Sequence, residues 1–294
     1  MLAMNRMKSI LVIVVTYNGM KWIDRCMESV VRCLLPVDVF VVDNGSTDGT
    51  VDHIREYYPS VILHCTGENH GFGRANNIGF RYALEHGYDY VYLLNQDAWV
   101  LQNTFSKLVE TMETNPEYGI LSPVQMTSSL DRPDPRFEAK CLSLPLDEYL
   151  SGVIIDVPFV MAAHWMISRR CLETVGGFSP VFSHYGEDDN WLHRAAYHGF
   201  KIGFLTGTFA VHDRENRPVT KDFRMRLKCV GSLVKISDPV RCLPVRFILQ
   251  PFEMLAISII YRSAYVMKQI MPMIRRYREL KTCRSQSMKK GAFL

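Results

Sequence analysis

The sequence predicts an α/β fold: a Rossmann-like, mostly parallel sheet with helices on both faces, followed by a helical C-terminal extension. Three observations support this prediction: short apolar runs early in the chain, helical spacing between them, and a long apolar and basic segment at the end. The apolar runs span residues 10–15, 37–42, 61–64 and 90–94. Because hydrophobicity is continuous along each run, these strands suit a parallel sheet that is covered on both faces.

Helices are predicted after each run, because apolar residues recur there every three or four positions. The faces that would be buried contain, in chain order, Trp22, Cys26, Val30 and Cys33; then Val51, Ile54 and Tyr58; then Ile78, Tyr82 and Ala83; and finally Phe105, Leu108, Val109 and Met112. The alternation of strand and helix over residues 10–115 favours a doubly wound parallel sheet.

The pattern is looser from residue 119 onward. Residues 127–150 are rich in Pro, Asp and Ser and predict a long loop. After it the sequence predicts a strand over 153–157, a helix over about 186–198, and two strands over 200–205 and 208–211.

Charge is unevenly distributed along the 294 residues. The formal net charge is +4, and residues 223–294 contribute +12, from 15 Lys and Arg against three acids, which leaves −8 for residues 1–222. An acidic body with a basic tail indicates an anionic partner for the tail. Hydrophobic residues make up 48% and charged residues 22% of the chain, which excludes disorder as its main state.

The eight cysteines are scattered without a CxxC pair, so a zinc site is not expected. The apolar run after Arg6 and Lys8 is too short for the hydrophobic region of a signal peptide, and no A-x-A cleavage site follows it. We therefore expect a reducing, cytoplasmic location.

Small polar residues follow all four predicted strands. The segments are Thr16, Tyr17 and Asn18; residues 43–50; residues 69–77; and Asn95, Gln96 and Asp97. Ligands of doubly wound sheets bind at the carboxyl ends of the strands. Turn formation explains one such segment, but four at one edge of a sheet indicate a binding site.

In the same order, these segments resemble the motifs of glycosyltransferase family 2, most nearly its rhamnosyltransferase-like branch. The resemblance rests on V-V-T-Y-N at 14–18, V-V-D-N-G-S-T-D-G-T at 41–50, N-H-G-F-G at 69–73, L-L-N-Q-D at 93–97, G-G-F at 176–178 and Y-G-E-D-D at 185–189. It implies a GT-A fold over residues 1–219, with a donor half at about 8–125 and an acceptor half at about 126–219. It also implies inverting transfer of a sugar from a nucleotide-activated donor. Residues 220–294 form the tail.

The resemblance implies a divalent ion, Mn²⁺ or Mg²⁺, held by Asp97 and His212. Asp97 occupies the last position of the family's D-x-D signature, which here reads Asn95-Gln96-Asp97. His212 matches a late histidine that some members use on the metal or the diphosphate, and an imidazole favours Mn²⁺ over Mg²⁺. The alternatives are a helix cap for Asp97 and a structural role for His212.

The resemblance also implies that Asp43 contacts the nucleotide base of the donor. Thr16, Asn18, Asn76 and Asn77, together with Asp97, are expected to border the same donor pocket. The alternative for Asp43 is an Asx-turn that only shapes the loop after the second strand.

Asp188 is the predicted catalytic base, since the resemblance places it in the acidic motif at a helix start. Three consecutive acids repel one another, which would raise at least one pKa. Glu187 and Asp189 are expected to contact the acceptor, and Trp165 to stack on a sugar. The alternatives are ordinary acid enrichment at a helix start, core packing for Trp165, and Asp189 as the base.

The tail predicts a helix that lies on a membrane. Residues 247–274 are strongly apolar, but Glu253, Arg262 and Lys268 interrupt them, so we do not expect them to span a bilayer. A basic cluster over residues 275–290 follows, which suits an anionic membrane surface. The alternative is a helix packed on the protein with a solvated basic end.

Together these features predict transfer from a dTDP- or UDP-sugar to a glycan or lipid-linked acceptor in cell-surface polysaccharide biosynthesis, on the cytoplasmic face of the membrane. A nucleic-acid partner is not expected. The alternatives are a catalytically silent nucleotide-sugar-binding scaffold and a sugar-nucleotide pyrophosphorylase. The latter would need a basic, Gly-rich loop after the first strand, where the sequence has only Thr16, Tyr17 and Asn18.

Overall fold

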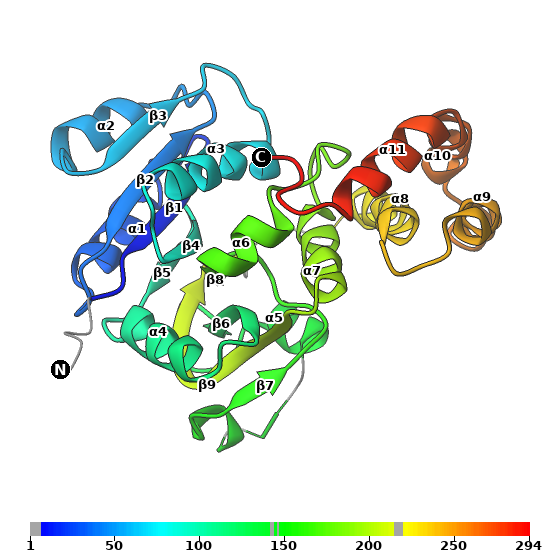
Figure 1. Cartoon of the computed structure of the whole chain (residues 1–294). Coiled ribbons are helices and arrows are strands. Elements are labelled where there is room, and N and C mark those ends of the chain that lie inside the picture. Colours follow the sequence, from blue (N-terminus) through cyan, green and yellow to red (C-terminus); the bar gives the residue numbers. More distant parts are fainter. Residues whose placement is uncertain (1–6, 142–143, 146, 215–219) are drawn as a thin grey trace.

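The computed structural model describes residues 7–141, 144–145, 147–214 and 220–294. Within this part of the chain, nine strands form one sheet in the order β3-β2-β1-β4-β8-β6-β9-β5, and β7 pairs with β9 beside that path (Figure 1). The predicted end of the catalytic domain at residue 219, and residues 142–143 and 146 of the predicted loop, lie outside the described residues.

The first four strands form a parallel half, as predicted. β1 (Ile10–Thr16), β2 (Asp38–Asp43), β3 (Ile62–Cys65) and β4 (Tyr90–Asn95) coincide with the apolar runs to within one residue. β1 pairs in parallel with β2 and β4, and β2 with β3. Because the strands run in one direction, their carboxyl ends meet at one edge of the sheet.

Helices cover both faces of this half. Leu11 and Ile13 pack with α3 (Phe72–Glu85) on one face, whereas Val12 and Val14 pack with α1 (Ile23–Val31) on the other. The second face is completed by α2 (Thr50–Tyr57) and α4 (Thr104–Thr114). Because alternate residues of β1 enter two different cores, the strand is apolar along its whole length.

The other half of the sheet is mixed. β8 (His164–Ser168) lies antiparallel between β4 and β6 (Tyr118–Met126). β5 (Ala98–Val100), which the sequence analysis missed, is too short for a periodic signal. β7 (Ile154–Asp156) confirms the strand predicted over residues 153–157.

The two strands predicted over residues 200–205 and 208–211 are one strand, β9 (Lys201–His212). Gly207 within it has a φ of 66°, and the pairing of β9 with β6 shifts register between Pro123 and Val124. A β-bulge, rather than a turn between strands, therefore interrupts the apolar pattern.

The predicted loop over residues 127–150 contains two short helices in its described part, α5 (Pro135–Lys140) and η1 (Glu148–Leu150). The Asp134 carboxylate caps α5 by accepting hydrogen bonds from the backbone N–H groups of Arg136 (2.9 Å) and Phe137 (2.8 Å). Asp followed by Pro is a helix-start signal that the loop prediction overlooked.

The tail is helical, as predicted. Its helices are α8 (Lys221–Ser237), α9 (Leu243–Ile260), α10 (Ala264–Arg275) and α11 (Tyr277–Ser287), and they follow α6 (Arg169–Val175) and α7 (Glu187–Tyr197) along the chain. The tail helices enclose an apolar cluster of their own, to which the preceding Val181 and Phe182 also belong. Figure 1 shows them as a lobe beside α7.

The end of the chain returns to the sheet-containing body. The carbonyl oxygen of Ala292 accepts a hydrogen bond from the N–H of Gly177 (2.7 Å), and the N–H of Gly291 donates to Thr174 (3.0 Å). A Cβ on Gly176 would lie only 2.1 Å from the Ala292 oxygen, so the Gly-Gly turn makes room for this contact. Figure 1 shows the C-terminus beside α3.

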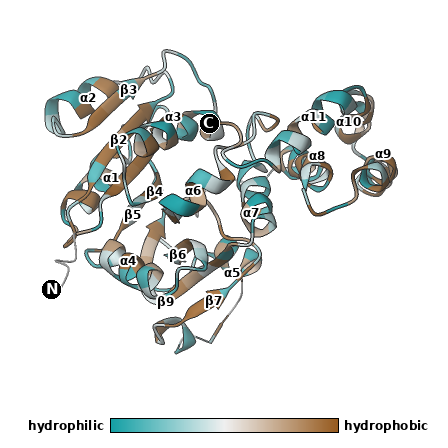
Figure 2. Ribbon diagram, in the orientation of Figure 1, coloured by the Kyte–Doolittle hydropathy of each residue, from teal (hydrophilic) through white to brown (hydrophobic). Residues whose placement is uncertain are grey.

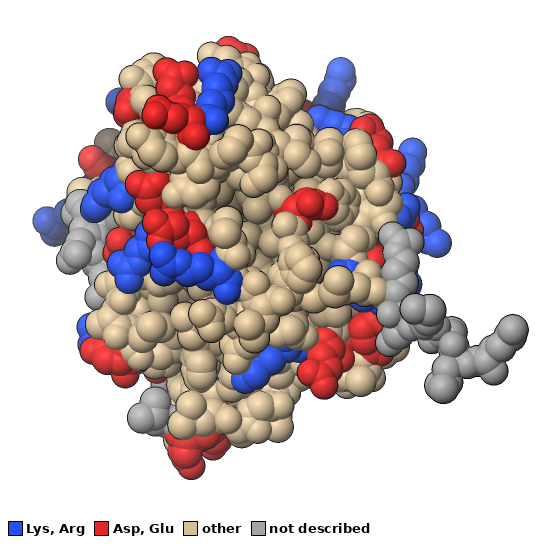
Figure 3. Space-filling model, turned by 90° about the vertical axis from the view of Figure 1, so that its left-hand side faces the viewer, with Lys and Arg blue, Asp and Glu red and all other residues tan. Residues whose placement is uncertain are grey.

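By length and composition alone, one helix in the described part of the chain could cross a membrane: α9, with 18 residues of which 22% are buried. Figure 2 shows its predominantly apolar colouring. The sequence analysis did not expect residues 247–274 to span a bilayer. That interval differs from α9 because it extends past the end of the helix and includes Arg262 and Lys268. On the face drawn in Figure 3, acidic and basic side chains lie close together in mixed groups.

Candidate active site

The loops after β1 and β2 form a dense polar network around Asp43. Its Oδ2 accepts hydrogen bonds from the hydroxyls of Thr16 (2.8 Å) and Ser46 (2.5 Å). Its Oδ1 accepts from the backbone N–H groups of Gly45 (3.0 Å) and Ser46 (2.9 Å). These four bonds match the usual acceptor capacity of a carboxylate. The Asx-turn alternative therefore describes Asp43 here, and a contact with a nucleotide base would require one bond to open.

Asn18 and Gln96 connect neighbouring loops at the same edge. Asn18 has a left-handed φ of 49°, and its Oδ1 accepts from the N–H of Thr47 (2.8 Å). The Gln96 amide accepts from the N–H of Tyr17 (2.9 Å) and donates to the Tyr17 oxygen (3.2 Å). The middle residue of Asn95-Gln96-Asp97 thus ties the loop after β4 to the loop after β1.

The structure corrects the donor-binding predictions for Asn76 and Asn77, which lie on the buried side of α3. Asn76 is 1% exposed, and its side chain donates to the oxygen of Phe72 (2.9 Å). The Asn77 amide donates to the oxygen of Phe178 (3.0 Å) and accepts from the N–H of the same residue (2.6 Å). Both amides are therefore engaged in holding the fold.

Trp165 is likewise not an acceptor contact. Its side chain is fully buried, with ring centroids 5.6 Å from Trp191 and 6.2 Å from Phe178, and its indole N–H donates to the oxygen of Val160 (3.1 Å). A sugar cannot reach the ring, so the core-packing alternative is correct.

A cavity of about 470 Å³ lies between the carboxyl edge of the sheet and the tail. It is lined by residues of separate elements: Asn95 at the end of β4, Arg136 and Lys140 on α5, Glu187, Asp188 and Asp189 at the start of α7, His212 at the end of β9 and Arg214 just after it, and Phe223, Leu227, Val230 and Val234 on α8. The tertiary structure thus brings the predicted base, Asp188, and one predicted metal ligand, His212, into one cavity. It also places there the cations of α5 and Arg214, which the sequence analysis missed.

A tight turn presents the three acids. Tyr185 and Gly186 have left-handed φ angles of 69° and 83°, and α7 begins immediately after them. A Cβ on Gly186 would lie 2.6 Å from Val230 on α8, so glycine permits the tail to pack directly on the acidic motif.

Burial raises the pKa of all three acids. Asp188 is affected most: burial, and then repulsion from Asp189 and Glu187, raise its pKa to about 8. Burial raises the pKa of Glu187 to about 7, and one of its carboxylate oxygens has no hydrogen-bond partner among the described residues. For Asp189, burial raises the pKa while Lys140 lowers it. The sequence analysis attributed the perturbation to repulsion, but burial contributes more.

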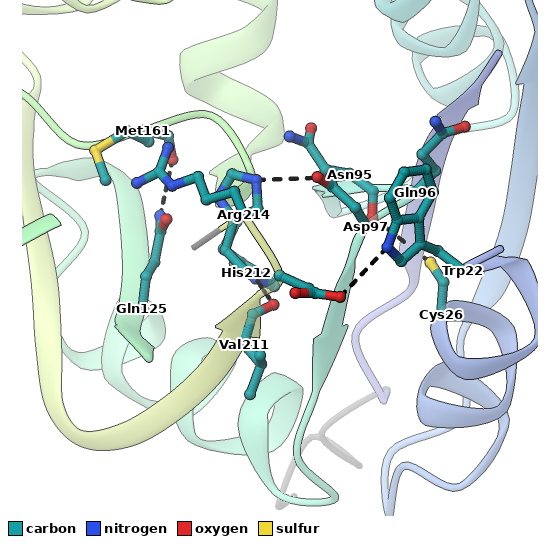
Figure 4. A network of polar contacts seen from close by, with 12 residues as sticks. Trp22, Cys26, Asn95, Gln96, Asp97, Gln125, Met161, Val211, His212 and Arg214 are labelled. Atoms are coloured by element: carbon teal, nitrogen blue, oxygen red, sulfur yellow. Dashed lines mark hydrogen bonds and ion pairs between the residues drawn. The ribbon is translucent and has the colours of Figure 1, made fainter. Parts of the chain in front are cut away.

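Asp97 and His212 face each other at the sheet edge, with 3.6 Å between Asp97 Oδ1 and His212 Nε2 (Figure 4). Both are buried, and neither ring nitrogen of His212 has a hydrogen-bond partner within the described part of the chain. Burial lowers the pKa of His212, which favours the neutral imidazole that binds metals. One carboxylate and one neutral imidazole suit a divalent ion whose remaining ligands come from a substrate or water.

Two neighbouring contacts hold this pair. The indole N–H of Trp22 donates to Asp213 Oδ2 (3.3 Å), and the N–H of Asp213 donates to the oxygen of Asp97 (2.9 Å). No group of three or more His, Cys, Asp or Glu side chains suited to a metal occurs among the described residues. The Asp97–His212 contact therefore brings together two potential metal ligands and no third described side chain of these types.

The model of the family described as "Glycosyl transferase family 2" matches residues 11–176. That span contains the loops after β1, β2 and β4 and the first glycine of the Gly-Gly turn. The chain belongs to glycosyl transferase family 2. The acids of α7 and His212 lie beyond the matched span, so their place in the site rests on the structure.

Relatives support the rhamnosyltransferase-like branch of family 2. The dTDP-rhamnosyl transferase RfbF of Shigella flexneri is 27% identical over 210 residues, which cover 69% of this chain and 66% of that protein. The N-acetylglucosaminyl-diphospho-decaprenol L-rhamnosyltransferase of Mycobacterium tuberculosis is 42% identical over 67 residues, 22% of each chain. The chain thus spans slightly less than two thirds of RfbF, and far less of the mycobacterial enzyme.

A solved structure confirms the predicted GT-A fold of this family 2 chain. The mannosyltransferase PcManGT from Pyrobaculum calidifontis, in complex with GDP-Man and Mn²⁺, superposes with a TM-score of 0.57 at 19% identity, over 96% of this chain and 85% of that chain. The two chains therefore resemble each other more in architecture than in sequence.

Proposed function

We propose that the chain is an inverting glycosyltransferase that moves a hexose or deoxyhexose from a nucleotide-sugar to a lipid-linked acceptor in cell-surface polysaccharide biosynthesis. The cavity lined by both Asp188 and His212, whose imidazole faces Asp97, on a family 2 scaffold, is the observation behind this proposal. In this proposal residues 1–219 form the catalytic domain, with a donor half at about 8–125 and an acceptor half at about 126–219. Residues 220–294 form the tail.

In this reaction Asp188 is the general base. Its carboxylate removes the proton of the acceptor hydroxyl while the hydroxyl oxygen attacks the anomeric carbon, and the bond from that carbon to the diphosphate oxygen breaks on the opposite face. Because burial raises the pKa of Asp188 to about 8, its carboxylate is a stronger base than an ordinary aspartate. Glu187 and Asp189 are assigned to acceptor contacts beside it.

The donor would lie over the loops after β1, β2 and β4. A divalent ion, Mn²⁺ or Mg²⁺, would stabilise the charge on the departing diphosphate. Asp97 and His212 would hold it, and the neutral imidazole favours Mn²⁺. Thr16, Asn18 and Asp43 would border the nucleotide. The name of RfbF supports a dTDP-sugar, and UDP-sugars are the alternative donors.

The tail would rest on the anionic, cytoplasmic surface of a membrane. Phe252 and Ile259 on α9 are 67% and 66% exposed, although both are large and apolar. The tail that contains them has a net charge of +12 over residues 223–294, and each basic residue near an anionic surface contributes about 1 kcal/mol. The lipid-linked acceptor in the name of the mycobacterial relative supports such a location.

Co-sedimentation with vesicles tests whether the tail binds an anionic membrane. The Phe252→Ser/Ile259→Ser double variant should bind anionic phosphatidylglycerol vesicles more weakly than the unmodified chain, because apolar anchoring is lost. Tyr57→Ser, which removes an equally exposed aromatic residue from α2, is the matched control. Equal sedimentation of all three proteins would return the tail to the packed-helix alternative.

Hydrolysis of the donor in the absence of an acceptor tests whether the chain is an enzyme that cleaves nucleotide-sugars. The purified chain, incubated with dTDP-rhamnose or UDP-sugars and MnCl₂, should release the nucleoside diphosphate, and EDTA should slow the release. Binding of a nucleotide-sugar without release of product from any donor would instead indicate a catalytically silent scaffold.

A further inference from the structure

Two cations on α5 line the cavity, and neither has an ion-pair partner in the described part of the chain. Arg136 and Lys140 are four residues apart, so they lie on one face of the helix, and both line the cavity. Within the described residues, neither side chain forms a salt bridge, and Lys140 Nζ lies 4.6 Å from the centre of the Phe159 ring. Arg214, the third cation of the cavity, is neutralised by the buried Asp134 carboxylate (2.5 and 3.1 Å).

The cavity has an apolar wall from α8. Phe223, Leu227, Val230 and Val234 line it at spacings of four, three and four residues, so one face of α8 is turned to the cavity. The same helix contributes Val234 and Met225 to the apolar cluster shared with α9 and α10. The apolar wall is therefore continuous, through Val234, with the buried apolar cluster of the tail.

We propose that this cavity binds an acceptor whose sugar is joined through a diphosphate to a polyprenyl chain. Arg136 and Lys140 bind the diphosphate, α8 contacts the first isoprenyl units, and the sugar hydroxyl reaches Asp188. This inference rests on the proposed glycosyl transfer and specifies its acceptor. A neutral glycan would satisfy neither the two cations nor the apolar wall, and a cavity of 470 Å³ is of the size that ligand sites have.

The donor also contains a diphosphate, so the cations could serve the donor instead. The Asp97–His212 pair, which suits the ion that would accompany a nucleoside diphosphate, lies at the sheet edge. Lys140 instead lies close enough to Asp188 and Asp189 for its charge to offset part of the burial-driven rise in the pKa of both. The acceptor hydroxyl must also approach Asp188, which favours the acceptor as the anion that Lys140 binds.

Calorimetric titration of the full chain with farnesyl diphosphate tests the proposal. Arg136→Gln/Lys140→Gln should weaken binding roughly tenfold or more, the scale expected for loss of charged hydrogen bonds. Arg132→Gln, which removes an exposed cation that does not line the cavity, should leave the affinity unchanged. Leu227→Ser should weaken binding of farnesyl diphosphate but not of inorganic pyrophosphate, because only the isoprenyl contact is lost.

Titration with UDP and dTDP separates the two possible diphosphates. Nucleotide affinity should be the same in the double variant as in the unmodified chain. If it falls as much as farnesyl diphosphate affinity does, the cations belong to the donor site and the proposal is wrong. An equal loss in Arg132→Gln would also overturn it, because binding would then reflect diffuse charge.

The donor-turnover assay keeps this inference separate from the proposed function. A chain that releases nucleoside diphosphate from a donor but does not bind farnesyl diphosphate retains its proposed function and lacks the proposed acceptor site. A chain that binds farnesyl diphosphate but turns over no donor would contradict the proposed function instead.

Discussion

The loops after β1 and β2 differ from the cavity at the start of α7 in how completely their polar groups are paired. Asp43 accepts four hydrogen bonds from its own loops. In contrast, a buried oxygen of Glu187 and both ring nitrogens of His212 have no hydrogen-bond partner among the described residues. Buried polar groups are normally paired, so the second region has bonding capacity that a substrate or an ion can satisfy. The first region shapes the site, and the second is suited to act on a ligand.

The largest effect is expected from Asp97→Ala, which removes the carboxylate of the Asp97–His212 pair. Transfer should fall by roughly 10³-fold, the upper range for loss of an electrostatic stabiliser, and Mn²⁺-dependent nucleotide binding should weaken. Initial rates with Mn²⁺ measure this, with Asp52→Ala on exposed α2 as the control. Normal turnover of the Asp97 variant would show that the metal is held elsewhere.

Asp188→Asn should lower kcat by about 10²-fold or more while donor affinity stays near normal, because the amide cannot accept the proton. Steady-state kinetics over a range of donor concentrations separate the two quantities. Asp189→Asn is the matched variant one residue away. A greater loss of kcat in Asp189→Asn would make Asp189 the base.

The pH profile should show the raised pKa of Asp188. Since the base must be deprotonated, kcat/KM should rise about tenfold per pH unit up to about pH 8 and then level off. Rates measured from pH 5.5 to 9 with a saturating metal concentration test this. A plateau that begins at pH 5 would mean that the base has an ordinary carboxyl pKa.

Asp43→Asn should lower the free energy of unfolding by about 1–3 kcal/mol, because an amide cannot accept all four hydrogen bonds and leaves buried donors unpaired. Urea unfolding measures the change, and Asp52→Asn is the exposed control. An unchanged midpoint would mean that the turn does not depend on the carboxylate.

The smallest effect is expected from Asp188→Asn on stability, the same aspartate-to-asparagine change made in the cavity at the start of α7. The folded-state pKa of Asp188 lies above its unfolded value, so the folded protein loses stability as the pH rises from about 4 to about 8. Asp188→Asn removes that loss and should raise the free energy of unfolding by about 1 kcal/mol or more at pH 8, with no gain near pH 4. Destabilisation by Asp188→Asn at pH 8 would contradict the assigned burial.

The sequence analysis located the parallel half of the sheet well because the information there is local. The runs that became β1 to β4 follow one another along the chain, and each needs only its own residues to be recognised. It failed for Asn76 and Asn77, because an amide beside a glycine-rich turn looks alike whether it faces a ligand or the core. Asn77 forms its hydrogen bonds with Phe178, 101 residues away, so they have no local signal, and Asn76 bonds Phe72 within its own helix.

The sequence by itself determined the family, the parallel half of the sheet and the order of its polar loops, since these depend on apolar periodicity and on residues adjacent in the chain. Only the tertiary structure decided which polar groups are unpaired and which share a cavity. α5, α7, β9 and α8 contribute to that cavity from positions spread between Arg136 and Val234 of the chain. Burial, the main cause of the raised pKa of Asp188, arises only when these elements pack together.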